Sequence, residues 1–499
     1  MNSTTATQSP AGFTLPRNTP AAAHTTLQLL QRLKVGSLSL TLPDGTVQRL
    51  GSPEGPHASM KLNNWNVCTA ALKSGDIGFA ETYIAGDWST PNLTALLELM
   101  IANRREVEDV IYGSWLGRLA YRVKHLLNRN SRTNSRKNIH AHYDLGNAFY
   151  RLWLDETMNY SSAWFEHPDQ PLEDAQHAKV RRALRMAGVK PGDRVLEIGC
   201  GWGALAEKAA TEFEASVVGV TLSTEQLAFA KERMRKHCIP LAGEVTANTR
   251  ADLRLQDYRD ISDAPFDAIC SIEMVEAVGR EYWPTYFQAV KRLLKPGGRA
   301  CIQSIVIDDA HFDRYIKGTD FIQQYIFPGG CLPCPRELRA QAAAAGLEVV
   351  DEFAFGPDYA RTLVLWRERF MHEQAEVLKL GFDQKFLRIW EFYLAYCEAA
   401  FSGGSIDVVQ YVLEAPPASP SAPPPEGGRT WRPGKAGSSG AMDWDISRRR
   451  ESTPRVACGA TPLKGGAPRG PAKPVPRVPW TETFRADDGI DWAVSDETS

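Results

Sequence analysis

Two carboxylates directly follow an apolar run near the middle of the chain. In the stretch FDAICSIEMVEAVG, Glu273 and Glu276 come just after residues 267–272, whose short apolar run predicts a buried strand. A charge at the end of a buried strand is costly unless a ligand or a reaction makes use of it. The pattern therefore indicates a functional site that needs carboxylates.

A glycine-rich turn is the second candidate for chemistry. The segment RVLEIGCGWGALAEKAA predicts a strand, a turn containing Gly199, Gly201 and Gly203, and a helix. Glycines in such a turn let a ligand approach the backbone closely, as in sites for nicotinamide dinucleotides or S-adenosylmethionine (SAM). A structural turn without a ligand is the alternative.

Polar residues around this turn favour SAM over a nicotinamide cofactor. Glu197 lies two residues before the first glycine, where a carboxylate can bind the amino-acid end of SAM. Where nicotinamide enzymes place an acid for the ribose, the segment VTLSTEQ offers Thr221 and Gln226, which are polar but not acidic. In LQDYRD, Asp257 is a candidate partner for the adenine amine, and Tyr258 is a candidate stacking surface.

Alternating strands and helices over residues 140–414 must position these groups. The clearest predicted strands are RVLEIG, SVVGVT, DAICSI and RACIQSIVI, and the predicted helices include STEQLAFAKERMRKH and REYWPTYFQAVKRLL. This alternation predicts an α/β fold with a mostly parallel sheet.

The flanking segments differ in character. After a disordered leader, residues 1–20, the hairpin pattern SLSLTLPDGTVQRLG and the helical spacing of NLTALLELMIANRREVEDVIYG predict a smaller α+β domain over residues 21–130. Residues 415–499 hold 14 of the 32 prolines and few large apolar residues, which predicts a disordered tail.

Residues 110–143 contain bases but no acid, and their apolar side chains fall on one helical face. One interpretation is an interfacial helix on anionic lipid. The other is an amphipathic helix that packs on its own domain and leads into a solvated basic linker.

Composition and charge exclude several classes of protein. A net charge of −2 over 499 residues gives no sign of a nucleic-acid partner. The nine cysteines are scattered and suggest no disulfide framework, so we expect a reducing, cytoplasmic compartment. The N-terminus lacks the pattern of a signal peptide, and no apolar run predicts a membrane span.

Seven motifs that follow one another in order resemble a single enzyme family: IHAHYDLGNAFYRLWLDETMNYSSAWFEHPDQPLEDAQHAKV, VLEIGCGWG, GVTLSTEQ, LQDYRD, EMVEAVG, QQYIFPGGCLP and FGPDYARTLVLW. Over residues 135–414 they resemble the cyclopropane-fatty-acyl-phospholipid synthases and the mycolic acid methyltransferases. The resemblance implies a class I SAM-dependent methyltransferase fold with a seven-stranded sheet. It also likens residues 21–130 to the lipid- or membrane-associated N-terminal domain of phospholipid-acting members.

The resemblance implies a reaction and a set of site residues. The SAM methyl would pass to the cis double bond of an unsaturated phospholipid acyl chain at the membrane surface, giving a cyclopropane, with bicarbonate as the usual base. The implied SAM contacts are Tyr160, Ser161, Gly199, Gly201, Gly203, Leu222, Gln226, Asp257, Tyr258 and Ile272. The implied bicarbonate contacts are Glu276, Gln303, the backbone of Ile305, and Tyr359. Candidate pocket residues, with core packing as their alternative role, are His142, Tyr143, Phe321, Tyr325 and Phe327.

The chain departs from the family pattern at the bicarbonate site. Ser162 stands where the family usually has a cysteine, Gln303 where it has a histidine, and Ala277 where it has the histidine of a Glu-His pair. Serine and glutamine still donate hydrogen bonds. Because Glu273 is an additional acid, we hypothesise that it supplements or replaces bicarbonate as the proton acceptor. The alternative is that Glu273 contacts SAM or acts through another base.

Three points stay open at this level. The product is a cyclopropane, or a methylene or methyl branch that would require a reductase partner, and a homodimer is one option for the assembly. The competing functions are a methyltransferase for a soluble small molecule and a catalytically silent SAM- or lipid-binding protein. The Cys-x-x-Cys pair, Cys331 and Cys334, lacks a second pair at metal spacing, so we expect no metal site.

Overall fold

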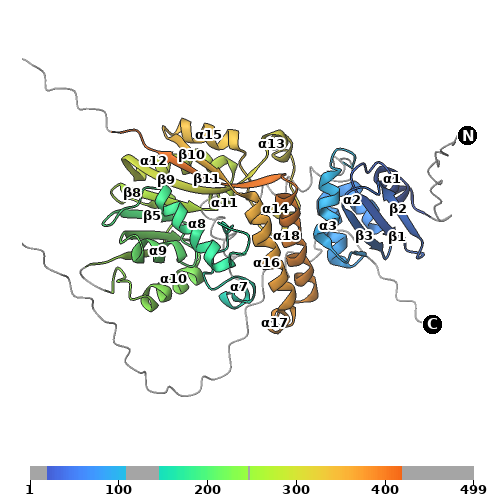
Figure 1. Ribbon diagram of the computed structural model, residues 1–499, viewed down its shortest axis with the longest axis horizontal. Coiled ribbons are helices and arrows are strands. Elements are labelled where there is room, and N and C mark those ends of the chain that lie inside the picture. The colour runs from blue at the N-terminus through green and yellow to red at the C-terminus, as the bar shows by residue number, and fades with distance from the viewer. Residues whose placement is uncertain (1–18, 108–144, 245–247, 418–499) are drawn as a thin grey trace, which may run out of the picture. The chain divides into compact units, whose positions relative to one another are not determined.

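The computed structural model describes residues 19–107, 145–244 and 248–417 (Figure 1). The predicted basic segment 110–143, the pocket candidates His142 and Tyr143, nearly all of the leader and the tail from residue 418 lie outside these ranges. Within the described ranges, no helix combines the length and apolar character needed to cross a bilayer.

The first described range forms a small α+β unit with a four-stranded sheet in the order β2-β1-β3-β4. The predicted hairpin is confirmed, because β1 and β2 pair antiparallel on either side of the turn at Gly45. The predicted helix begins after Asn92, whose side chain caps the backbone N–H of Ala95 (3.0 Å), and it ends at Ala102. The elements are α1 (Ala21–Leu30), β1 (Ser37–Thr41), β2 (Val47–Gly51), β3 (His57–Leu62), α2 (Asn66–Ala85), β4 (Trp88–Ser89) and α3 (Leu93–Ala102).

The larger sheet has seven strands in the order β10-β11-β9-β8-β5-β6-β7. Strands β5 to β9 pair in parallel, while β11 pairs antiparallel with β9 and with β10. The predicted class I methyltransferase architecture is therefore confirmed. The strands are β5 (Arg194–Ile198), β6 (Ser216–Thr221), β7 (Ala251–Leu255), β8 (Phe266–Ile272), β9 (Leu294–Ile307), β10 (Glu348–Ala354) and β11 (Ile406–Glu414).

Helices cover both faces of this sheet, which explains why its strands are nearly continuous apolar runs. In β5, Val195 packs with the helices of one face, whereas Leu196 packs with those of the other. The first face carries α8 (Leu172–Met186), α9 (Ala204–Thr211) and α10 (Thr224–Lys236). The second carries α12 (Trp283–Leu293) and α15 (Pro335–Ala344).

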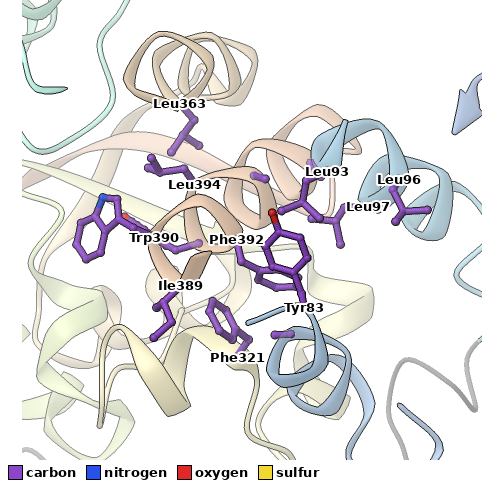
Figure 2. Close-up of a cluster of buried hydrophobic side chains, with 14 of the residues drawn as sticks. Tyr83, Leu93, Leu96, Leu97, Phe321, Leu363, Ile389, Trp390, Phe392 and Leu394 are labelled. Carbon is purple, nitrogen blue, oxygen red and sulfur yellow. The ribbon is translucent and has the colours of Figure 1, made fainter. Parts of the chain in front are cut away.

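A further helical layer links the two sheets' hydrophobic cores. Helix α18 packs against α16 and also against α2 and α3. Figure 2 shows Tyr83 of α2 beside Phe392 of α18, with their ring centroids 5.8 Å apart, and Phe321 below them. The remaining elements are α7 (Asn147–Trp153), a 3-10 turn (Tyr258–Asp260), α11 (Val275–Val278), a 3-10 turn (Arg280–Tyr282), α13 (Asp309–Tyr315), α14 (Phe321–Tyr325), α16 (Gly356–His372), α17 (Gln374–Lys379) and α18 (Gln384–Ser402).

The strand order defines where a ligand can bind. From the central strand β5 the chain continues to β6 and β7 on one side, whereas β8 and β9 lie on the other. At such a reversal the loops leave the carboxyl ends of neighbouring strands in opposite directions and open a crevice. The glycine turn follows β5 and the two carboxylates follow β8, so the fold brings both candidate motifs to one crevice.

Candidate functional site

A cavity of about 1030 Å³ lies at this crevice. The predicted cofactor residues that line it are Tyr160, Ser161, Glu197, Gly199, Gly201, Thr221, Leu222, Gln226, Asp257, Tyr258 and Ile272. The predicted catalytic residues Glu273, Glu276 and Tyr359 line the same cavity. Gly203, Ser162 and Gln303 do not line it, so any influence they have on a ligand must pass through a neighbour.

The glycine turn is held by the backbone of β6. The N–H groups of Gly199 and Cys200 both donate to the carbonyl of Val220, at 3.0 and 2.9 Å. Gly203 begins α9 with a φ of 84°, and a Cβ there would lie 2.9 Å from the Cβ of Ala230. Gly203 therefore permits close packing of α9 on α10, and it does not contact the cavity.

Glu197 has the properties expected of a partner for a cationic ligand group. The side chain is buried, and its Oε2 has no hydrogen-bond partner among the described residues. Burial raises the pKa of this carboxyl well above its usual value, because the charged form lacks solvation. An ammonium group such as that of SAM would supply both the missing donor and the opposite charge, so the residues present fit SAM.

The other polar cofactor candidates also bind one another. Thr221 Oγ1 donates to Gln226 Oε1 (3.0 Å), which holds both side chains at the cavity wall. The Asp257 carboxylate accepts from Nε and Nη2 of Arg259, at 2.8 and 2.6 Å. Asp257 therefore anchors the 3-10 turn that carries Tyr258, in addition to facing the cavity.

Glu273 occupies the most unusual position in the cavity. Its backbone is left-handed (φ 51°), which is strained for a residue with a side chain, and its N–H donates to the Gln303 carbonyl (2.8 Å). The carboxylate accepts three hydrogen bonds: Oε1 from Ser162 N–H (2.9 Å) and Gln303 Nε2 (2.8 Å), and Oε2 from the Tyr359 hydroxyl (2.8 Å). These donors stabilise the ionised form.

Hydrogen bonds to residues other than Glu273 determine the orientation of the Gln303 amide. Gln303 on β9 is paired in register with Gln410 on β11, and Gln410 Nε2 donates to Gln303 Oε1 (3.0 Å). Arg182 Nη1 in turn donates to Gln410 Oε1 (2.6 Å). Because its oxygen is engaged, Gln303 must present its NH2 group to Glu273. Sequence reasoning missed Gln410 and Arg182, since no local pattern marks them.

Lys179 is a second residue that sequence reasoning missed, although it lies within a family-like motif. The side chain is fully buried in α8, and Nζ donates to Ser161 Oγ (2.5 Å). Burial lowers the pKa of this amine to about 8, and the carboxylates of Glu273, Asp155 and Glu197 oppose that shift. Conversely, the Lys179 charge opposes the burial that raises the pKa of Glu273. A basic residue on the buried face of an amphipathic helix was the available signal.

Glu276 is held differently from Glu273. One carboxylate oxygen accepts from the backbone N–H of Ile305, and Oε2 has no hydrogen-bond partner among the described residues. Burial, followed by the charge of Glu273, raises the pKa of Glu276 to about 8. At neutral pH the hydrogen-bond donors around Glu273 favour its ionised form. The raised pKa of Glu276 favours its protonated form.

This raised pKa predicts a pH-dependent stability. Above the ordinary pKa of 4.5, folded Glu276 keeps a proton that the unfolded chain releases, so the free energy of unfolding falls as pH rises from 4.5 to about 8. We expect Glu276→Gln to reduce that slope and to raise the unfolding free energy at pH 8 by at least about 1 kcal/mol. Denaturant titrations across this pH range measure it; an unchanged slope contradicts the assignment. Burial also raises the pKa values of Asp76 and Asp320, to about 6 and about 7. Part of the decrease in unfolding free energy with rising pH should therefore remain in the Glu276→Gln variant as well as in the wild type.

The donors that the resemblance assigns to bicarbonate already serve two protein carboxylates. Tyr359 and Gln303 donate to Glu273, and the backbone of Ile305 donates to Glu276. The Ser162 hydroxyl donates to the carbonyl of Ala163 (2.8 Å), so only the backbone N–H of Ser162 reaches Glu273. These residues therefore do not fit a separate bicarbonate as well.

The aromatic pocket candidates divide into two groups. Phe327 lines the cavity, whereas Phe321 and Tyr325 do not. Phe321 packs on Phe392 with ring centroids 4.8 Å apart, and the Tyr325 hydroxyl donates to Glu81. Their role is packing between α14, α18 and α2. Among the described residues, no three His, Cys, Asp or Glu side chains group as metal ligands would.

Comparison with known proteins agrees with this geometry. The family model described as mycolic acid cyclopropane synthetase matches residues 130–411. The tuberculostearic acid methyltransferase UfaA1 of Mycobacterium tuberculosis is 39% identical over 424 residues, which are 82% of this chain and 96% of the relative. The cyclopropane-fatty-acyl-phospholipid synthase of Escherichia coli is 36% identical over 358 residues, 71% of this chain and 87% of the relative.

Solved structures give the same result for the larger sheet and its helices. The cyclopropane synthase MmaA2 of Mycobacterium tuberculosis superposes with a TM-score of 0.51 at 32% identity, covering 56% of this chain and 98% of that protein. The mycolic acid cyclopropane synthase CmaA1, in a complex with SAH and CTAB, gives the same TM-score, identity and coverage.

Proposed function

Because the chain belongs to the mycolic acid cyclopropane synthetase family and is a SAM-dependent methyltransferase, we propose that it methylates the cis double bond of an unsaturated acyl chain, with Glu273 as proton acceptor. The observation that supports this most directly is the Glu273 carboxylate, which lines the cavity and is fixed by three donors. In this proposal no bicarbonate takes part.

The residues of the chain meet the demands of alkene methylation. When bound, SAM supplies an electrophilic methyl group. Attack by the double bond joins this carbon to one alkene carbon and leaves a cation on the other, which water would trap. The aromatic faces of Tyr359 and Phe327 at the cavity wall can stabilise that cation. Glu273 then removes a proton from the newly attached methyl group.

Two products arise from this one cation. If the C–H electron pair closes directly onto the neighbouring cationic carbon, the product is a cyclopropane. If a hydride first shifts from the methyl-bearing carbon to the cationic carbon, loss of the same methyl proton gives a methylene branch. We propose the cyclopropane as the product. The methylene branch is the second candidate, favoured by the relative named a tuberculostearic acid methyltransferase, and it would require a separate reductase to become a methyl branch.

The proposal places the enzyme at a membrane surface. Acyl chains of phospholipids are buried in the bilayer, so the enzyme must approach that surface to reach them. The predicted basic face of residues 110–143 is suited to an anionic surface. We therefore propose peripheral association and phospholipid acyl chains as the substrate.

Product analysis tests the function. The protein is incubated with SAM and vesicles of dioleoyl phosphatidylglycerol, and the released acyl chains are analysed by mass spectrometry and proton NMR. We expect a one-carbon gain, with NMR distinguishing ring protons from vinylidene protons. Unchanged chains in a protein that binds SAM would reject the proposal in favour of a silent binding protein. Methylation of soluble small molecules alone would favour a different methyltransferase.

A further inference from the structure

Helix α8 carries two fully buried polar residues, Gln176 and Lys179, three positions apart on one face. A buried ammonium group is costly unless its surroundings make use of the charge. Both residues lie in EDAQHAKV, the end of the first of the seven motifs, but neither lines the cavity. They therefore do not touch a substrate, and any part they play in the reaction must pass through a neighbour.

Both side chains hold the same residue of the loop before α8. Lys179 Nζ donates to the hydroxyl oxygen of Ser161 (2.5 Å), and Gln176 Nε2 donates to the Ser161 carbonyl (2.8 Å). Ser161 lines the cavity, and the backbone N–H of the next residue, Ser162, donates to Glu273 Oε1 (2.9 Å). Ser161 thus connects α8 to the cavity wall and to the proposed base.

The ammonium group of Lys179 also acts on Glu273 through its charge. Of the carboxylates that raise the pKa of the amine, Glu273 has the largest effect, and Asp155 and Glu197 have smaller ones. Conversely, the charge of Lys179 is the largest influence that opposes the rise in the pKa of Glu273 caused by burial. The two side chains are therefore each other's main electrostatic partner.

The other ionisable side chains beside Glu273 are Tyr359 and Glu276. The Tyr359 hydroxyl donates to the carboxylate without adding charge, and the raised pKa of Glu276 favours its neutral form at neutral pH. Lys179 adds the positive charge that balances an ionised Glu273 inside the protein. A buried carboxyl group without such a charge tends to keep its proton, and a protonated carboxyl cannot act as a base.

We propose that Lys179 is a positioning residue for the methylation reaction. Its ammonium group fixes Ser161, and with it the backbone N–H of Ser162, against the Glu273 carboxylate, and its buried charge keeps that carboxylate ionised. Gln176 shares the first of these tasks and not the second. This inference rests on the proposed function, in which Glu273 is the base, and adds the residue that keeps Glu273 in its basic form.

Substitutions separate the two tasks. Lys179→Met removes the charge together with the bond to Ser161, whereas Gln176→Met removes a bond to Ser161 and leaves the charge. Lys179→Arg keeps a positive charge. Lys208→Met is the matched control, because Lys208 lies on the neighbouring helix α9, pairs with Glu212 (3.2 Å) and does not line the cavity. Single-turnover rates are measured with saturating SAM and dioleoyl phosphatidylglycerol vesicles from about pH 6 to about pH 9.5.

We expect Lys179→Met to shift the acidic limb of the pH–rate profile to higher pH by about one unit or more, the usual effect of losing a nearby opposite charge. Burial lowers the pKa of Lys179 to about 8, so the wild type loses the same charge at alkaline pH, and the two profiles should converge there. Lys179→Arg should keep the wild-type limb. Gln176→Met should lower the rate by a similar factor at every pH, and Lys208→Met should match the wild type.

Three results would overturn the proposal. The first is a limb in Lys179→Met that stays at the wild-type pH, whether or not the rate falls. The second is a limb in Gln176→Met that shifts as far as in Lys179→Met, because the position of the loop alone would then explain the effect. The third is a limb in Lys179→Arg that shifts as far as in Lys179→Met.

A double-mutant cycle tests the charge pair without relying on activity. Denaturant titration near neutral pH gives the unfolding constants of the wild type, Lys179→Met, Glu273→Gln and the double variant. Lys179→Met should raise the unfolding constant at least about threefold more in the wild type than in Glu273→Gln, because glutamine carries no charge that needs a partner. Equal effects in both backgrounds would overturn the proposal. If Lys179→Met does not fold, the double variant should fold, and failure of both would overturn the proposal too.

The two measurements distinguish this inference from the proposed function. Turnover that persists in Glu273→Gln would reject Glu273 as the base and with it the proposed function. Loss of turnover in Glu273→Gln, together with an unshifted limb in Lys179→Met, would overturn the inference about Lys179 and leave the proposed function in place.

Discussion

Replacing Glu273 by glutamine is expected to abolish lipid methylation while SAM still binds. Glutamine has nearly the same shape as glutamate but cannot accept the methyl proton. Among the described residues, the Glu273 carboxylate is the only group that accepts hydrogen bonds from all three of Ser162, Gln303 and Tyr359. Loss of a general base typically costs about 10²- to 10⁴-fold in rate. Single-turnover rates measure the loss, and calorimetric titration with SAM measures binding.

A matched control comes from a carboxylate remote from the cavity. Glu391 accepts from the Tyr83 hydroxyl (2.8 Å), a contact of the same type, and neither residue lines the cavity. Glu391→Gln should retain wild-type turnover. Glu273→Ala leaves three donors around a carboxylate-sized space, so added formate or bicarbonate should restore part of the activity. Full turnover by Glu273→Gln, or wild-type turnover that requires added bicarbonate, would reject Glu273 as the base.

Tyr359→Phe is expected to shift the acidic limb of the pH–rate profile to higher pH. The Tyr359 hydroxyl bonds the charged form of Glu273 and so lowers the pKa of that carboxyl, against burial, which raises it. Without the hydroxyl, Glu273 takes up its proton at higher pH and is a poorer base near neutrality. A hydrogen bond to a charged group contributes about 1.5–3 kcal/mol, so the rate at neutral pH should fall roughly tenfold or more.

Recovery of activity by Tyr359→Phe at high pH distinguishes stabilisation of the Glu273 charge from a general loss of structure. Activity should return as the pH is raised, because deprotonation of Glu273 restores the base. Tyr83→Phe removes the equivalent hydroxyl from Glu391 and should leave the profile unchanged. A profile for Tyr359→Phe that is lowered uniformly at every pH would contradict the assigned contact.

Much of the methyltransferase fold is accessible from the sequence because it depends on local patterns. Apolar runs such as SVVGVT need no partner to be identified as buried strands, and the run of glycines after Glu197 marks the cofactor turn by residue type alone. The break of α2 at Gly75 is less accessible, because a single glycine in a helical pattern does not reveal that the chain reverses its φ there.

The site itself could be predicted only in part. Strand periodicity ends at Ile272, and the left-handed backbone of Glu273 then turns its side chain in a direction that no periodic pattern contains. Its donors come from the loop before α8, from β9 and from α16, which are far apart in the chain. The orientation of Gln303 depends on its register with Gln410.

By itself, the sequence determined the kind of enzyme: a strand and glycine turn for SAM, a crevice carboxylate pair, and motifs that resemble lipid methyltransferases. Only the tertiary structure decided that Glu273 takes the donors expected for bicarbonate, that Lys179 opposes the rise in the pKa of Glu273, and that residues of the small α+β unit line the same cavity as Glu273. The physical reason is the separation along the chain over which each effect acts. Propensity and periodicity act over a few neighbouring residues, whereas hydrogen-bond convergence and cavity shape depend on how distant elements pack.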